Sequence, residues 1–345
     1  MTYLMTIVAI LSVLTACTSK TPPKEAIQNA LTSSMEMTSY TFSGSLAVDE
    51  LDVPAELLEG MDPSMLDMVR DASLNINGVY REDPMQMEMT LDLTIPGDMA
   101  FTVKTEMVMT EDKMYVKVPN IPMLPLGDAA GKFVEIDPKQ LAEEQGTPVP
   151  ELDIETQRRM GQELAGVLFK HFDEEQYFEE LKKADAGLPE GVEADRVIKF
   201  NVTQETFEPM VMTIVDKVAP EMIDLLLANE DYLNALQLTK EDLETAKEEL
   251  AAGDRSELTE ALETFKKDVK VNELSLTTAI QDQWPVYQSA NVNLDVTQDG
   301  QTAKVGLSFT SQYANINEEV TFEIGIPEDA ISMDELEQMV MAPAL

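Results

Sequence analysis

Residues 85–95 constrain the fold most, because apolar and polar side chains alternate strictly along them. Every odd position in this run (MQMEMTLDLTI) is apolar, and every even position is polar. A period of two places successive side chains on opposite faces of a β-strand. The run therefore predicts a strand with one buried and one wet face, which is typical of an antiparallel sheet.

Further strands and several helices follow from the same kind of pattern. Alternation or short apolar runs between turn residues predict strands at 40–48, 72–81, 100–110, 113–118, 191–202, 269–281, 285–297, 302–312 and 319–326. Asp299-Gly300 is a strong hairpin signal between two of them. Apolar residues at helical spacing predict helices at 24–37, 154–172, 204–229, 240–265 and 333–340.

About ten antiparallel strands with helices grouped between them predict an α+β fold. A sheet of that size curls, because the twist between neighbouring strands accumulates. We expect a strongly curved sheet, an incomplete barrel, with the amphipathic helices packed in its concave face.

The N-terminus predicts export and lipidation. An uncharged apolar run from Tyr3 to Ala16 has the length of a signal-peptide core and is too short to cross a bilayer. It ends in Leu-Thr-Ala-Cys, which resembles a bacterial lipobox, and Cys17 is the one cysteine of the chain. We expect a signal peptide at 1–16, a diacylated Cys17, a polar tether at 17–23 and a single domain at 24–345. Within that domain, a helical segment is expected at about 204–268.

The layout of the chain resembles the LolA/LppX-like superfamily of extracytoplasmic lipoproteins. The resemblance rests on the lipobox, the tether, a first helix that ends in SMEMTSYTFSGSL (34–46), and the late segment TTAIQDQWPVYQSANVNLDV (277–296). The chain is most similar to the uncharacterised Gram-positive lipoproteins of that group. The resemblance implies a half-barrel with helices on its concave side and a cavity that holds acyl chains in members that carry lipids. It also implies that the chain has no catalytic residues.

The charge excludes several classes of partner. The chain has 65 acidic and 24 basic residues, a formal net charge of −41. Nucleic-acid binding needs clusters of Lys and Arg, so it is not expected. Electrostatic docking on anionic lipid is excluded for the same reason, which leaves the acyl chains on Cys17 to hold the protein at the extracytoplasmic side of the cell membrane.

The chain contains 22 methionines, an unusually high number. Met85, Met87 and Met89 have a spacing compatible with a soft Cu(I) site. The same face continues into Leu91, however, so we interpret them as apolar lining and expect no metal. On the neighbouring strands, Phe42, Met107 and Met109 would extend this face, and flexible thioethers suit a surface that adapts to ligands.

Enzyme motifs and cofactor loops are not found in the sequence. His171, the one histidine, follows a predicted helix beside acidic residues, and we interpret it as a surface residue. The leading hypothesis is an extracytoplasmic lipoprotein, not an enzyme, that binds a lipid or other hydrophobic ligand between sheet and helices. The alternative is a structural or interaction lipoprotein of the cell envelope whose helices fill the concavity completely.

Overall fold

The computed structural model describes residues 21–54, 66, 68–97, 100–121, 126–145, 154–252 and 255–341. The predicted signal peptide, Cys17 and the first part of the tether lie outside these residues.

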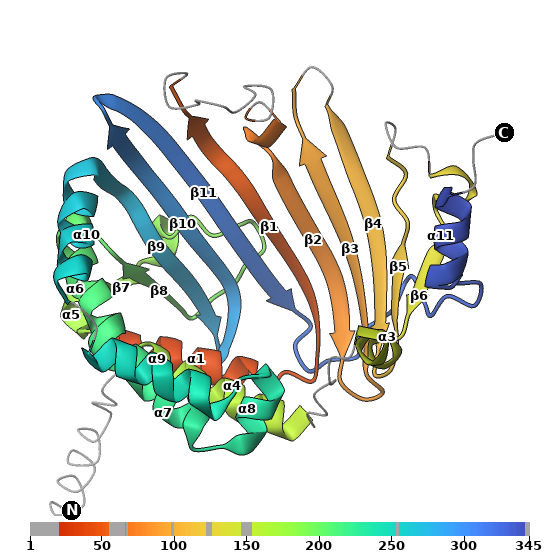
Figure 1. Ribbon diagram of the computed structural model, residues 1–345, viewed down its shortest axis with the longest axis horizontal. Helices are drawn as coiled ribbons and strands as arrows, with labels where there is room; N and C mark the ends of the chain where they lie inside the picture. Colours follow the sequence, from red (N-terminus) through yellow and green to blue (C-terminus); the bar gives the residue numbers. More distant parts are fainter. Residues whose placement is uncertain are drawn as a thin grey trace, which may run out of the picture.

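Eleven strands in the described part of the chain form one antiparallel sheet, in the order β6-β5-β4-β3-β2-β1-β11-β10-β9-β8-β7. The strands are β1 Ser39–Asp52, β2 Ser73–Arg81, β3 Gln86–Ile95, β4 Phe101–Thr110, β5 Met114–Lys117, β6 Phe133–Ile136, β7 Phe178–Leu181, β8 Arg196–Asn201, β9 Val269–Gln281, β10 Trp284–Gln298 and β11 Gln301–Ala314. The sheet curves and remains open between β6 and β7 (Figure 1). The predicted α+β fold, a curved antiparallel sheet with helices in its concave face, is therefore confirmed.

Most of the helices lie between β6 and β9 in the sequence. They are α1 Pro23–Ser34, α3 Pro138–Gln145, α4 Ile154–Leu168, α5 Glu174–Tyr177, α6 Gln204–Thr213, α7 Ala219–Leu227, α8 Glu230–Leu236, α9 Lys240–Ala252, α10 Arg255–Asp268 and α11 Met333–Met341. Figure 1 shows the main group of helices beside the β7–β10 end of the sheet and α11 beside β6 at the other end.

The segment predicted as one helix at 204–229 contains α6, a π-helical turn at Ile214–Val218 and α7. Pro220 lacks an N–H, so it cannot donate to the carbonyl four residues before it. In the wider turn, the Ala219 N–H reaches the Ile214 carbonyl instead. The prediction at 240–265 corresponds to two helices, α9 and α10.

The strand predicted at 319–326 is wrong. No strand forms there, because both edges of β11 are already paired, one with β10 and one with β1. Residues 315–332, here the C-terminal strap, instead run from the end of β11 to β6 across the sheet face that points away from the helices. The strap is held near β1 by the Ser39 hydroxyl, which donates to the Glu318 carbonyl over 2.7 Å. At β6, Ile331 exchanges backbone hydrogen bonds with Phe133 and Glu135, each 2.8 Å long.

The strands β6 and β7 were not predicted. Each has only four residues, too few to establish a period of two.

The main core lies between the helices and the β7–β9 end of the sheet. Its centre is a cluster of aromatic side chains, in which the Phe200 ring lies 5.2–5.6 Å from the rings of Phe169, Phe172, Tyr177 and Phe178. A second apolar cluster joins α7, α8 and α9 through Ile223, Leu233 and Leu243. Because the buried side chain of α9 belongs to this cluster, α9 packs on other helices as an outer layer.

Candidate functional site

The helix-facing side of the sheet, here the inner face, carries an apolar row that crosses nine strands. Residues directly opposite each other in an antiparallel sheet share a face. The strand registers place the following residues opposite one another in succession from β7 to β4: Phe178, Phe200, Leu276, Ala290, Phe309, Leu46, Leu74, Leu93 and Val103.

The helices cover this row at one end only. At β7, the Phe178 side chain is 8% exposed beneath the aromatic core. On β11, β1 and β3, Phe309, Leu46 and Leu93 are 43%, 47% and 38% exposed. Leu74, between Leu46 and Leu93 on β2, is partly exposed. Side chains of this type are normally buried, so several exposed ones along a single cross-strand row are an unusual surface for a folded domain.

Charged residues are missing from the same region of the inner face. In the registers that pair β10, β11 and β1 to β5, no inner-facing position carries Asp, Glu, Lys or Arg. The opposite face of β3 and β4 carries polar side chains such as Glu88, Asp92 and Lys104. Although the chain has a net charge of −41, its acidic side chains are therefore absent from this part of the inner face.

The residues predicted to line a cavity lie on the inner face, apart from Met85. A second cross-strand row runs through Phe42, Gly78, Met89 and Met107. Met87 lies opposite Met109, and Leu91 follows Met89 on the same face. All of these predicted side chains are partly buried. Met85 precedes β3 in the turn that joins it to β2.

Gly78 provides the space for Phe42. A Cβ atom added at Gly78 would collide with the Phe42 ring, so the ring lies directly over the glycine. The sequence contains an indication of this contact, since Gly78 occupies the inward-facing position between Ile76 and Tyr80, where a larger apolar side chain is expected.

A group of tyrosine rings lies at the start of β1. The Tyr40 ring lies 5.1 Å from that of Tyr80 and 5.4 Å from that of Tyr313. Burial, followed by the neighbouring Tyr313 and Tyr80, raises the pKa of the Tyr40 phenol to about 12. The phenol is therefore neutral at physiological pH, and this part of the inner face is uncharged as well.

His171 lies away from the inner face in an ion-pair group. Its Nε2 is 2.5 Å from a carboxylate oxygen of Glu221, and the Lys170 ammonium donates to the other oxygen over 2.5 Å. The hydrogen bond from Lys170, followed by the one with His171, lowers the pKa of the Glu221 carboxyl group. The group joins the end of α4 to α7, which gives His171 a structural contact.

The row through Phe309, Leu46, Leu74 and Leu93 was not predicted from the sequence. Each residue has the right alternation in its own strand, but the sequence does not show which strands are neighbours. The row exists only because β11 pairs with β1.

Comparisons with known protein families and with curated proteins find no match to this chain. Within the described residues, none of the helices has the length and apolar character required to cross a membrane.

Proposed function

We propose that this protein is a membrane-anchored, non-catalytic lipoprotein of the LolA/LppX type that holds a lipid or another hydrophobic ligand on the uncovered part of the inner face. The supporting observation is the apolar row, which continues from the helix-covered core onto exposed Phe309, Leu46 and Leu93 without meeting a charge. Removing apolar surface from water lowers the free energy by about 25 cal/mol for each Å², so such a face favours the binding of an apolar ligand.

The size of this surface suits acyl chains. Neighbouring strands lie about 4.8 Å apart, so β11 and β1 to β4 present a band roughly 20 Å wide. Monomeric proteins rarely expose contiguous apolar patches of more than a few hundred Å² unless the patch binds a ligand or a partner. The exposed row also argues against the alternative of a completely filled concavity, because the helices leave these side chains in water.

The first experiment is native mass spectrometry of the protein extracted from its own host. We expect a copurifying lipid or other apolar molecule of defined mass. Binding of the uncharged probe N-phenyl-1-naphthylamine then tests the location.

Leu46→Asp places a charge in the apolar row, and we expect at least about tenfold weaker probe binding, since a buried unpaired charge costs several kcal/mol. Ser45→Asp is the matched control, because Ser45 is the adjacent residue on the opposite face. Equal probe affinity in the two folded variants would place the ligand elsewhere. Absence of any apolar ligand in both experiments would favour the structural or interaction lipoprotein.

A further inference from the structure

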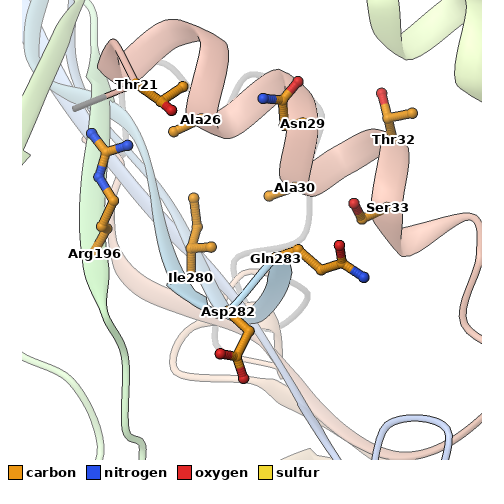
Figure 2. Close-up of a pocket in the computed structure, with 10 residues that line it drawn as sticks. All are labelled: Thr21, Ala26, Asn29, Ala30, Thr32, Ser33, Arg196, Ile280, Asp282 and Gln283. Carbon is orange, nitrogen blue, oxygen red and sulfur yellow. The ribbon is translucent and has the colours of Figure 1, made fainter. Parts of the chain in front are cut away.

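A separate polar cleft lies beside α1, on the rim of the sheet (Figure 2). Its volume is about 480 Å³, within the range of small-ligand sites. The buried side chains of Ala26, Ala30 and Ile280 form an apolar floor. The two alanines are one helical turn apart, and their small side chains leave the hollow between α1 and the β9–β10 turn.

Hydrogen-bonding side chains surround this floor. Asn29, Thr32 and Ser33 come from α1, and Gln283 extends toward Ser33 from the β9–β10 turn (Figure 2). In the described part of the chain, these four side chains make no hydrogen bond with one another or with other residues. Their donors and acceptors are therefore available to a ligand.

The charges at the cleft disfavour an anionic ligand. The Arg196 guanidinium, which points toward Thr21, already makes two hydrogen bonds of 3.2 and 3.0 Å with the Glu180 carboxylate. Asp282 contributes a carboxylate at the rim. With its cation neutralised and an acid nearby, the cleft offers neutral amides and hydroxyls, which complement hydroxyl groups better than phosphates or carboxylates.

The position of the cleft adds a second argument. Thr21, which lines the cleft, is four residues after Cys17, and four residues span at most about 14 Å. With the acyl anchor on Cys17, Thr21 at the edge of the cleft lies within that distance of the anchored residue. Headgroups of neighbouring lipids are then the nearest abundant molecules.

We propose that this cleft binds an uncharged polyhydroxyl group, the sugar headgroup of a membrane glycolipid. The inference rests on the lipid anchor in the proposed function, but not on ligand binding at the inner face. The apolar floor contacts the carbon face of the sugar ring, while the surrounding amides and hydroxyls bond its hydroxyl groups.

The test uses the full lipidated protein in phosphatidylcholine vesicles, with and without glucosyl diacylglycerol. Trp284, the one tryptophan of the chain, follows Gln283 directly, so its fluorescence reports on the cleft. We expect a saturable change in emission with glycolipid and slower amide exchange at residues 281–284. In Asn29→Ala/Gln283→Ala the half-saturating glycolipid fraction should rise about tenfold or more, because two neutral hydrogen-bonding partners are removed.

Asn234→Ala/Gln298→Ala is the matched control, because it removes the same two residue types at exposed positions on α8 and β10 and should leave binding unchanged. No response of Trp284 fluorescence or amide exchange, or one that persists in Asn29→Ala/Gln283→Ala, would overturn the proposal. An equal response to phosphatidylglycerol would overturn the preference for an uncharged group.

An equal response to free methyl glucoside would support the sugar site and overturn its membrane source. Probe binding at the inner face is measured in the same samples. If the probe does not bind at the inner face while the glycolipid response is intact, the proposed ligand-binding function is rejected and the glycolipid site is retained.

Discussion

Glu88 should hold the middle of the C-terminal strap to the sheet, between its attachments at Ser39 and at β6. Its side chain is 3% exposed, on the face of β3 opposite the methionines. One carboxylate oxygen accepts the N–H groups of Glu323 and Ile324, both over 2.8 Å, and the other accepts that of Gly325 over 2.6 Å. Gly325 has a φ of +73°, a left-handed conformation that helps to turn three consecutive N–H groups toward one anion.

The expected cost of losing this carboxylate is large. Hydrogen bonds to a charged group contribute about 1.5–3 kcal/mol each, but the three share one anion and are not additive. Replacement by alanine would remove the acceptor of all three strap N–H groups at once. We expect Glu88→Ala to lower the free energy of unfolding by about 3–5 kcal/mol, and Glu88→Gln by roughly 1–3 kcal/mol, because the amide keeps one acceptor.

Urea unfolding and hydrogen exchange at residues 318–331 measure these effects. Asp92→Asn is the control, because Asp92 lies four residues from Glu88 on the same face of β3. We expect this substitution to change the free energy of unfolding by no more than about 0.5 kcal/mol. The strap amides should exchange faster in both Glu88 variants and normally in the control. If Glu88→Ala costs no more than Asp92→Asn, the three hydrogen bonds do not hold the strap and the reasoning is wrong.

Three other predictions concern the inner face and the anchor. Because the folded-state pKa of Tyr40 is about 12 against an ordinary value of 10.0, its contribution to stability is complete below pH 10 and is lost as the pH rises toward 12. Urea unfolding across that range should show a shallower loss in Tyr40→Phe, and an unchanged slope would contradict the assigned burial. Gly78→Val should displace both the Phe42 ring and the Glu88 backbone carbonyl and destabilise the fold by about 1–3 kcal/mol, whereas Asn77→Val, at the adjacent exposed position, should have little effect. Equal unfolding free energies would show that the space around Gly78 is not closely filled. Cys17→Ala should release the protein from the membrane and abolish labelling by a palmitate analogue, since two acyl chains are needed for durable anchoring; an unlabelled wild type would refute lipidation.

Local pattern in the sequence predicted most of the strands and helices. The alternation in residues 85–95 identifies β3 and its two faces, because the side-chain period of a strand is independent of its neighbours. The run at 269–281 coincides with β9, and the Asp299-Gly300 signal lies at the β10–β11 turn. The curved α+β fold followed from the number of strands and their antiparallel pattern.

Tertiary structure alone decided which strands are neighbours, and with that the candidate site. The pairing of β1 with β11 joins residues more than 250 positions apart and places Leu46 opposite Phe309. The local pattern of either strand is the same whichever partner it has, so no sequence window could indicate the apolar row.

Tertiary structure also overturned the strand predicted at 319–326. Glu88 has the ordinary position of a solvent-facing residue in an alternating strand, yet it is buried because the strap crosses above it. The apolar and polar alternation of a segment sets which of its faces can be buried. The availability of a free strand edge sets whether the segment pairs at all, and that depends on the whole chain.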